Sequence, residues 1–575
     1  ATRLEGRIDG WVTGNVGSLR VYRHEGEARV TGHALAYRIA RGPNPFASIC
    51  GRVCGAPCER ACRRGTIDRP VSIRAIKRTT TERYGVETAP DLRTTLEMST
   101  AAGSLDAEPN GHKVAVVGAG CAGLTAAHDL RRLGYGVTVF EALPHPGGML
   151  RYGVPKFRLP VELVEREIEA IVSMGVELHC NVRIGRDKTL EQLRDEGYDA
   201  IFLGAGLQRS RGLDLPGAEL EGVIPGLKHL YEFNTGVEGH SLGRVVVIGG
   251  GDVAFDCART AARMEGTDGV TLVCLESLDE MPADTVEILE GDEEGVARRN
   301  RFGPVRFVGE NGKLTGLEVR QVERVFDAEG RFNPVLIEGP EEVLPCDTVL
   351  VAIGQMGDTE FARGVQELDL GGGGTVTADF DTGRTSVPWL FAGGDIALGP
   401  RLFIDAVAQG QRAARSIHEY VTGERIPSND DRAFACEFIR EGLAHDYLES
   451  KRLFPPATDP ESRLASTEAP VEVMYDDPDA RAQGARCLRC EVETVFDGTE
   501  CILCGGCADV CPTYCLRLVS LEEIGMADPS MPGASAIIKD EDRCIRCAQC
   551  AIRCPTDAIT MERLVGHEPW QVVRL

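Results

Sequence analysis

Eight cysteines near the carboxy terminus fall into two runs with identical spacing. They are Cys501, Cys504, Cys507 and Cys511, then Cys544, Cys547, Cys550 and Cys554, with a proline after the last cysteine of each run. This C-x2-C-x2-C-x3-C-P spacing is typical of bacterial ferredoxins, where the fourth cysteine of each run ligates the other cluster. The spacing therefore predicts one [4Fe–4S] cluster on Cys501, Cys504, Cys507 and Cys554, and another on Cys544, Cys547, Cys550 and Cys511. Zinc is the alternative, but the doubled spacing with both prolines disfavours it.

Six other cysteines are candidates for a separate metal site. They are Cys50, Cys54, Cys58, Cys62, Cys487 and Cys490. The first four recur at every fourth residue, but Gly51, Gly55 and Pro57 interrupt a regular helix, so we expect a looped cage supported by a helix over 72–81. Structural zinc is the alternative, since it favours paired CxxC ligands. Nearby arginines would offset the negative charge of an iron–sulfur cluster.

The remaining cysteines are scattered, and packing is their expected role. They are Cys121, Cys180, Cys257, Cys274, Cys346, Cys436 and Cys515. Of these, Cys515 stands just outside the ferredoxin spacing, and we expect a buried thiol. The sequence shows no export signal, so the cysteine clusters are interpreted as metal ligands and not as disulfides.

A dinucleotide-binding pattern begins at an apolar strand over 114–117. Gly118, Gly120 and Gly123 follow in G-x-G-x-x-G spacing, then a helical segment, a strand over 136–140 and Glu141. In this pattern the first glycine permits the tight turn, the second admits a pyrophosphate and the third lets the helix pack on the strand. The closing acid is expected to bind a ribose diol. A tight turn without a ligand is the alternative.

The same pattern recurs at 244–254. Gly249, Gly251 and Ala254 give G-x-G-x-x-A, and the second strand of this unit ends at Glu276. Two such units imply two nucleotide sites, which indicates a flavin and a nicotinamide dinucleotide.

Other residues complete the expected nucleotide contacts. For the flavin they are Ala119, Ala122, Gly147, Gly148, Leu150, Arg158, Gly394 and Asp395; for the nicotinamide nucleotide they are Asp252, Val253 and Gly354. The two adjacent glycines at 147–148 suit a close approach of the backbone to a flat ligand. The Gly394–Asp395 turn joins a strand to a helix, where the helix amino terminus favours phosphate.

Length and charge set limits on the class of protein. The 575 residues suffice for three or four domains, and the net charge of -25 argues against binding to nucleic acid or anionic membranes. No apolar run is long enough to span a bilayer, so we expect a cytoplasmic protein without membrane contact.

Motifs over about 35–425 resemble those of one flavoprotein family. CGRVC, VVGAGCAGLTAA, GGMLRYGVPKFRLP, VIGGGDVAFDCARTAAR and FAGGD are similar to segments of the small subunit of glutamate synthase. They also resemble the amino-terminal part of dihydropyrimidine dehydrogenase and the flavin subunits of NAD(P)H–ferredoxin oxidoreductases. The resemblance implies FAD in the first unit, NAD(P)H in the second, and iron–sulfur clusters beside the flavin.

The sequence departs from the family in two places. The family's amino-terminal CxxC loop is missing before Cys50, and Cys487–Cys490 looks like its relocated counterpart. We therefore expect one full cluster there, because a second would need a non-cysteine ligand or a cysteine such as Cys515. NADPH-using relatives carry arginines where Leu275 and Glu276 stand, and a carboxylate at Glu276 predicts NAD(H), since it would repel a 2′-phosphate.

The expected fold is α/β, with two Rossmann-like dinucleotide-binding domains, an α-helical amino-terminal Fe–S domain and a carboxy-terminal α+β ferredoxin-like domain. The predicted boundaries are 1–108 for the helical Fe–S domain, 109–243 with 380–425 for FAD, 244–379 for NAD(H), 426–495 for a linker with the CxxC pair, and 496–575 for the ferredoxin domain.

The sequence predicts an electron-transfer flavoprotein subunit with FAD, NAD(H) and at least three [4Fe–4S] clusters. Its partner would be a ferredoxin or a catalytic subunit, such as a 2-oxoacid, aldehyde or acyl-CoA oxidoreductase. No catalytic side chain is expected, because the flavin itself accepts the hydride. The alternatives are a stand-alone or bifurcating NAD(P)H:ferredoxin oxidoreductase, and a non-catalytic relay or assembly module.

Overall fold

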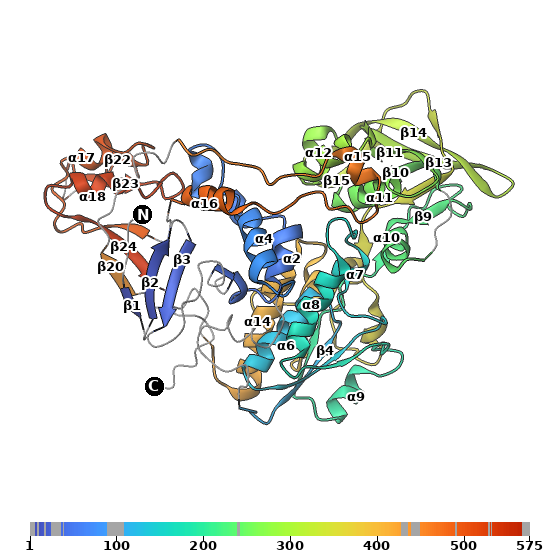
Figure 1. Cartoon of the computed structure of the whole chain (residues 1–575), viewed down its shortest axis with the longest axis horizontal. Coiled ribbons are helices and arrows are strands. Elements are labelled where there is room, and N and C mark those ends of the chain that lie inside the picture. The colour runs from blue at the N-terminus through green and yellow to red at the C-terminus, as the bar shows by residue number, and fades with distance from the viewer. Residues whose placement is uncertain are drawn as a thin grey trace.

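The computed structural model in Figure 1 describes most of the chain. The described residues are 6–8, 11–16, 19–24, 36–37, 40–88, 108–237, 242–426, 435–438, 449–488, 492–526, 530 and 532–565. In this part of the chain, no helix is both long enough and apolar enough to cross a membrane.

The first dinucleotide unit forms a five-stranded parallel sheet in the order β19-β7-β4-β5-β6. Its strands are β4 (Lys113–Val117), β5 (Gly136–Phe140), β6 (Glu177–His179), β7 (Ala200–Leu203) and β19 (Leu390–Ala392). Val114 and Val116 pack against α6 (Cys121–Arg132), α8 (Val161–Val172) and α14 (Phe403–Thr422) on one face. Because helices and loops cover both faces, β4 is a nearly continuous apolar run.

The second unit forms another five-stranded parallel sheet, in the order β12-β11-β10-β17-β9. Its strands are β9 (Val223–Pro225), β10 (Gly243–Ile248), β11 (Thr267–Cys274), β12 (Ala297–Asn300) and β17 (Thr348–Val351). On one face lie α10 (Gly226–Thr235), α11 (Asp252–Ala262) and α12 (Thr285–Glu293). The other face is covered by an antiparallel sheet of β13 (Phe302–Glu310), β14 (Lys313–Phe326), β15 (Phe332–Leu336) and β16 (Glu342–Pro345).

Both predicted boundaries of the second domain lie some twenty residues too late in the chain. β9 pairs with β17, so the second domain begins before residue 244. Phe361 and Val376 pack against Ala115 and Val117 of the first sheet, so the first domain resumes before residue 380. The two crossing segments pair with each other as β8 (Arg209–Ser210) and β18 (Gln355–Met356). Such short strands carry no periodic signal, which is why the sequence did not reveal them.

The amino-terminal region is not entirely helical, contrary to the helical domain predicted over 1–108. β1 (Gly6–Ile8), β2 (Trp11–Val16) and β3 (Leu19–His24) form an antiparallel sheet. The sequence WVTGNV-GS-LRVYRH is itself typical of a hairpin, since two β-favouring runs flank a Gly–Ser pair. Helices follow: α2 (Ala47–Val53), α3 (Pro57–Arg60), the 3-10 turn η1 (Arg63–Thr66) and α4 (Ile73–Tyr84). Of these, α4 is the helix expected over 72–81.

The ferredoxin-like module is α+β, as predicted, but it extends into the expected linker. It contains α17 (Gly506–Asp509), α18 (Gln549–Arg553), β22 (Leu516–Ser520), β23 (Ser535–Lys539) and β24 (Ile559–Val565). β20 (Ala435–Phe438) and β21 (Val492–Phe496) pair with the two edges of β24. The segment 426–495 therefore contributes two strands to the module and is not only a linker.

Residues 449–488, called the arm below, cross the molecule between the module and the second sheet (Figure 1). α16 (Asp477–Ala485) packs on α4, and Arg74 of α4 makes a two-pronged ion pair with Glu472, at 2.6 and 2.7 Å. At the other end, Arg463 of α15 (Pro460–Leu464) donates to Glu293 of α12 at 2.9 Å. The arm thus ties the Fe–S helices to the second dinucleotide domain.

Shorter elements complete the described fold. They are α7 (Met149–Tyr152), α9 (Leu190–Asp195), α13 (Asp395–Leu398), η2 (Leu278–Glu280), η3 (Thr359–Ala362) and η4 (Gly372–Gly374).

The Arg74–Glu472 pair predicts a measurable role for the arm. Glu472→Gln should loosen the arm by about 1–3 kcal/mol, because the largely buried guanidinium loses its charged partner. Limited proteolysis should then cut within 449–488 faster, and the first thermal transition should fall. Glu468→Gln, an exposed residue of the same arm, is the matched control. Equal cleavage rates for the two variants would contradict the role of the pair.

Candidate cofactor and metal sites

The first glycine-rich turn has the geometry that the sequence predicts. Gly118 has φ +99, and a Cβ built on it would lie 2.5 Å from the carbonyl oxygen of Gly204. A Cβ on Gly123 would lie 2.0 Å from the carbonyl oxygen of Gly118, so α6 packs tightly on β4. A Cβ on Gly120 would meet nothing within 4 Å. The middle glycine therefore opens onto free space at the amino terminus of α6, which is the place for a pyrophosphate.

Glu141 supports this turn with its buried carboxylate. Oε2 accepts a hydrogen bond from the backbone N–H of Ala119 at 2.8 Å, and Oε1 accepts one from the N–H of Leu143 at 2.8 Å. Burial raises the pKa of Glu141. Each oxygen retains a lone pair, so the expected bond to a ribose hydroxyl is compatible with these contacts.

Two segments that are distant in sequence converge on the first turn. The N–H of Gly147 donates to the carbonyl of Ala119 at 2.8 Å, and a Cβ on Gly148 would lie 3.1 Å from the Cα of Gly120. Gly394 has φ +73, and a Cβ built on it would lie 3.0 Å from Cβ of Ala122. The glycine therefore lets α13 approach α6 closely. Asp395 begins α13, and burial raises its pKa to about 6. The glycine-rich turn, the 147–148 loop and the start of α13 thus form one cradle, and Leu150 is buried on the adjoining α7.

The second turn has the same geometry. Gly249 has φ +145, and its Cβ would lie 2.3 Å from the carbonyl oxygen of Ala352. For Gly251 the nearest atom to a Cβ would be Cγ of Pro282, at 3.9 Å. Asp252 and Val253 open α11, and Gly354, at φ +116, also faces free space. A second cradle for a dinucleotide is therefore present.

Glu276 lies beside this second cradle, just beyond β11. Its Oε2 would be 2.7 Å from a Cβ built on Gly250, so the carboxylate faces the glycine-rich turn. Burial, reinforced by the charge of Glu280, raises the pKa of Glu276. The position fits the ribose end of a dinucleotide bound in this unit.

Arg158 occupies a different environment from the one the sequence suggested. Its Nη1 donates to Asp256 at 2.6 Å, and its Nη2 pairs with Glu287 at 2.6 Å. Both acids belong to helices of the second domain, so Arg158 bridges the two dinucleotide domains. Its contact with a flavin stays a prediction.

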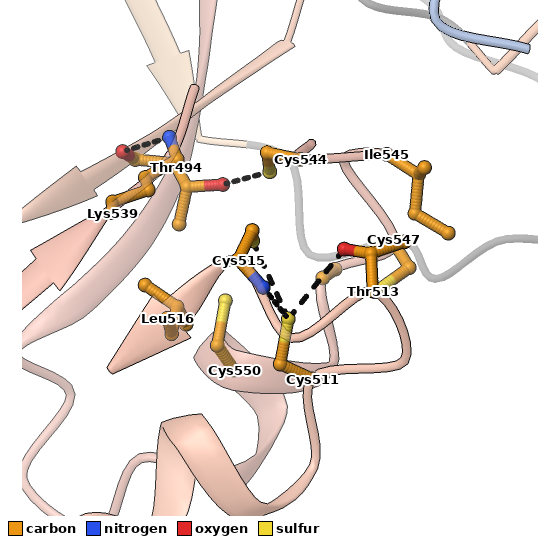
Figure 2. Close-up of a pocket in the computed structure, with 11 residues that line it drawn as sticks. Thr494, Cys511, Thr513, Cys515, Leu516, Lys539, Cys544, Ile545, Cys547 and Cys550 are labelled. Atoms are coloured by element: carbon orange, nitrogen blue, oxygen red, sulfur yellow. Dashed lines mark hydrogen bonds between the residues drawn. The ribbon is translucent and has the colours of Figure 1, made fainter. Parts of the chain in front are cut away.

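The eight cysteines of the ferredoxin-like module line two separate cavities. One, shown in Figure 2, is lined by Cys511, Cys544, Cys547 and Cys550, together with Cys515. The other is lined by Cys501, Cys504, Cys507 and Cys554. Each cavity takes three cysteines from one run and the fourth from the other run, which is the crossed grouping that the spacing predicts.

The ligand set of these cavities suits a cluster. Within the described residues, no group of three or more His, Cys, Asp or Glu side chains is arranged to hold a single metal ion. Each cavity instead brings together four cysteines of the crossed set. Four thiolates are the ligands of a [4Fe–4S] cluster.

The two runs also repeat each other's backbone. Leu503 and Arg546 have φ +54 and +56, and Tyr514 and Asp557 have φ +52 and +55. Gly505 and Ala548, at φ +75 and +64, precede α17 and α18. Non-glycine residues rarely adopt these conformations, and they persist where a site requires them. Both loops are therefore shaped in the same way around their cavities.

The amino-terminal cysteines lie on short helical pieces. Cys50 is in α2, Cys54 directly follows it, Cys58 is in α3 and Cys62 precedes η1. Gly55 lies between α2 and α3, and Pro57 begins α3, so no regular helix runs through this stretch, as expected. Gly51 does not interrupt α2: its missing Cβ would lie 2.7 Å from Cα of Arg78, so the glycine permits a close crossing with α4.

A positive charge lies against the first of these cysteines. Nζ of Lys77 is 3.5 Å from Sγ of Cys50. A hydrogen bond from Cys54, and then the charge of Lys77, lower the pKa of Cys50 to about 6. The same contact raises the pKa of Cys54. No sequence motif marks Lys77, although it lies on the predicted supporting helix, one turn after Ile73.

The arm brings Cys487 to the same region. The preceding residue, Arg486, is buried and donates at 2.7 Å to both Asp68 and the carbonyl of Arg69, just beyond Cys62. Cys490 lies outside the described residues. Cys515 lines the Cys511 cavity in the ferredoxin-like module, so it does not supply the extra amino-terminal ligand that was considered for it.

Three family descriptions match successive parts of the chain. Residues 112–410 match pyridine nucleotide-disulphide oxidoreductase, which spans both cradles and more than half of the chain. The chain belongs to this family. Residues 27–88 match dihydropyrimidine dehydrogenase domain II with a 4Fe-4S cluster, and residues 500–558 match a 4Fe-4S dicluster domain. The protein is therefore an oxidoreductase with a dinucleotide-binding core and 4Fe–4S domains on both sides of it.

Curated relatives carry related names. The chain is 39% identical over 488 residues to the NADP(+)-dependent formate dehydrogenase subunit beta of Moorella thermoacetica, covering 79% of this chain and 66% of that subunit. It is 34% identical over 495 residues to the NADPH-Fe(3+) oxidoreductase subunit beta of Geobacter sulfurreducens, covering 79% and 70%. It is 34% identical over 399 residues to the glutamate synthase [NADPH] small chain of Azospirillum brasilense, covering 67% and 80%.

The crossed cavities predict an unusual pattern of iron loss. Cys554→Ala should remove about four irons, the content of one [4Fe–4S] cluster. The Cys501→Ala and Cys554→Ala double variant should lose no further iron, because both cysteines line one cavity. The Cys511→Ala and Cys554→Ala double variant should lose about eight irons in total. Iron analysis of the purified variants measures this, with Cys180→Ala as the control. A loss of only four irons from the Cys544→Ala and Cys554→Ala double variant would show uncrossed ligation.

Proposed function

We propose that the chain is an electron-transfer subunit that moves electrons between a nicotinamide nucleotide, FAD and [4Fe–4S] clusters, to or from a partner oxidoreductase. The single observation that carries this proposal is the presence, in one chain, of two open glycine cradles and two crossed four-cysteine cavities. The binding residues are those the sequence predicted, in the first domain for FAD and in the second for the nicotinamide nucleotide.

The protein's contribution is binding and orientation. The turn at Gly118–Gly123, the Gly147–Gly148 loop and α13 would hold FAD, while Glu141 fixes the first turn. Bound FAD accepts two electrons from a nicotinamide and passes them on singly to iron–sulfur clusters. Around the first cradle, burial keeps Asp395 and Glu141 in a low-dielectric setting, as their raised pKa values indicate. No side-chain nucleophile or general base is needed.

The proposed cluster content is at least three. Two belong to the ferredoxin-like module, and one belongs to the cysteines around α2 and α3 together with Cys487 and Cys490. A contact joins these regions, because Arg63, next to Cys62, donates to Asp542 at 3.0 Å, two residues before Cys544. This supports an electron path from the amino-terminal site to the Cys544 cavity and then to the Cys501 cavity.

The Cys501 cavity is the proposed point of exchange with a partner. Cys504 is exposed, whereas Cys544, Cys550 and Cys511 are buried. Ile502, an apolar side chain that lines the cavity, is also 64% exposed. Relatives named as subunits of formate dehydrogenase and of an Fe(3+) oxidoreductase favour a fixed partner over a stand-alone ferredoxin reductase.

Anaerobic reduction of the purified chain tests the proposal. NADH should bleach the flavin and cluster absorbance and support reduction of an artificial one-electron dye. Gly120→Ala should fold normally, because its Cβ meets open space, but it should lose FAD and dye reduction while retaining iron. Gly498→Ala, another open position, is the control. A chain that binds FAD but is reduced by neither nicotinamide nucleotide would instead be a relay without nicotinamide binding.

The finer choice of nucleotide rests on Glu276. Its partly buried carboxylate faces the second glycine-rich turn. There it would accept a hydrogen bond from a ribose 2′-hydroxyl and would repel a 2′-phosphate. The names of the relatives include NADP(+) and NADPH. We propose that this chain uses NAD(H).

Exchanging this charge should reverse the preference. Glu276→Arg should move the ratio of kcat/KM for NADH to that for NADPH by about tenfold or more towards NADPH, since about 1.4 kcal/mol corresponds to tenfold. Steady-state dye reduction with each nucleotide measures the ratio. Glu323→Arg makes the same charge change at an exposed site on β14 and should leave the ratio unchanged. Wild-type kcat/KM with NADPH equal to or above that with NADH would refute the assignment.

A further inference from the structure

One thiol in the ferredoxin-like module has no place in the crossed cysteine pattern. Cys515 is only 5% exposed and lines the cavity of Cys511, Cys544, Cys547 and Cys550. Its Sγ is 3.4 Å from Sγ of Cys511, and its backbone N–H donates to the same sulfur at 3.3 Å (Figure 2). Cys511 therefore receives two contacts from one residue.

The internal repeat shows which of these contacts is special. Cys511-Pro-Thr-Tyr-Cys-Leu in the first run corresponds to Cys554-Pro-Thr-Asp-Ala-Ile in the second, so Ala558 occupies the position of Cys515. The two threonines make matching contacts, since Oγ1 of Thr513 is 3.7 Å from Cys511 Sγ and Oγ1 of Thr556 is 3.7 Å from Cys554 Sγ. An alanine has no polar side-chain atom, so the thiol contact exists at Cys511 and has no counterpart at Cys554.

The direction of the hydrogen bond follows from the chemistry of the ligand. A cysteine that binds a cluster does so as a thiolate, and a thiolate can only accept. The S–H of Cys515 must then be the donor. A donor to a ligand sulfur stabilises the additional negative charge of the reduced cluster, and such hydrogen bonds are one of the means by which proteins set cluster potentials.

We propose that Cys515 is a positioning residue whose S–H donates to the sulfur of Cys511 and raises the reduction potential of that cluster relative to the cluster on Cys501, Cys504, Cys507 and Cys554. The inference rests on the proposed function, which supplies the two clusters. Lys539 also lines this cavity, with Nζ donating to the carbonyl of Thr494 at 3.3 Å, so a comparison of the two wild-type potentials alone does not isolate the thiol.

Three substitutions isolate the contribution of the thiol. Cys515→Ala reproduces the residue that the second run already carries, Cys515→Ser retains a donor, and Ala558→Cys creates the same contact beside Cys554. Each purified chain is titrated anaerobically with the cluster signals followed by electron paramagnetic resonance, and its iron content is measured.

We expect Cys515→Ala to lower the midpoint potential of one cluster of the module and to leave the other unchanged, with full iron. Cys515→Ser should restore most of the shift. Ala558→Cys should raise the midpoint of the other cluster. This reciprocal pair separates a hydrogen bond from a general loosening of the module, which would not lower one midpoint in the first variant and raise the other midpoint in the second.

Other outcomes would overturn the inference. Unchanged midpoints in a Cys515→Ala chain that retains its iron would overturn it and leave the proposed function intact. Loss of about four irons on Cys515→Ala would show that Cys515 is itself a cluster ligand. A wild-type chain without the clusters of the module would overturn both this inference and the proposed cofactor content.

Discussion

The fold depends on ion pairs that join segments from different domains. Glu472 of the arm accepts two hydrogen bonds from Arg74 and lies 4.0 Å from Arg78, so the arm is fixed to the helix that supports the amino-terminal cysteines. Although burial opposes it, the charge of Arg74 lowers the pKa of Glu472. The stabilisation is therefore complete above the carboxyl's unfolded-state pKa and disappears as the pH falls through the folded value.

A second network joins the two dinucleotide domains to the arm. Arg259 is fully buried and contacts Glu287, Glu290 and Glu294 at 2.6 to 2.9 Å. Glu287 also pairs with Arg158 of the first domain, and Glu294 lies 3.6 Å from Arg463 of the arm. Each charge is costly to bury alone, so removal of any one partner leaves the others uncompensated. The network therefore favours one arrangement of the two cradles, and hydride transfer between two bound nucleotides requires such an arrangement.

The sequence predicted the parts of the site that depend on neighbouring residues. The strand, the turn at Gly118–Gly123 and the helix after it are set by residues close together in sequence. The cysteine spacing is equally local. For this reason both predictions agree with the structure. The domain boundaries failed because β9 pairs with β17, more than a hundred residues away, and short strands carry little signal of their own. Gly51 was misread because its role is set by α4, which crosses α2. The contact of Cys515 with Cys511 could have been anticipated from an alignment of the two runs, in which Cys515 and Ala558 are equivalent positions.

The two cysteine runs of the ferredoxin-like module are near-duplicates of each other. Two identical cluster sites would have equal potentials and would give electrons no preferred direction. The backbone repeats down to matching left-handed residues such as Leu503 and Arg546, so direction has to arise from side chains. Burial differs, since Cys504 is exposed while its counterpart Cys547 is only partly so. Hydrogen bonding differs at Cys515, and charge differs because Lys539 lines one cavity and Ile537 the other. Exposure, hydrogen bonds to sulfur and local charge are the variables that set cluster potentials, and all three distinguish the two halves. The asymmetry of the module is thus concentrated around its sulfur atoms.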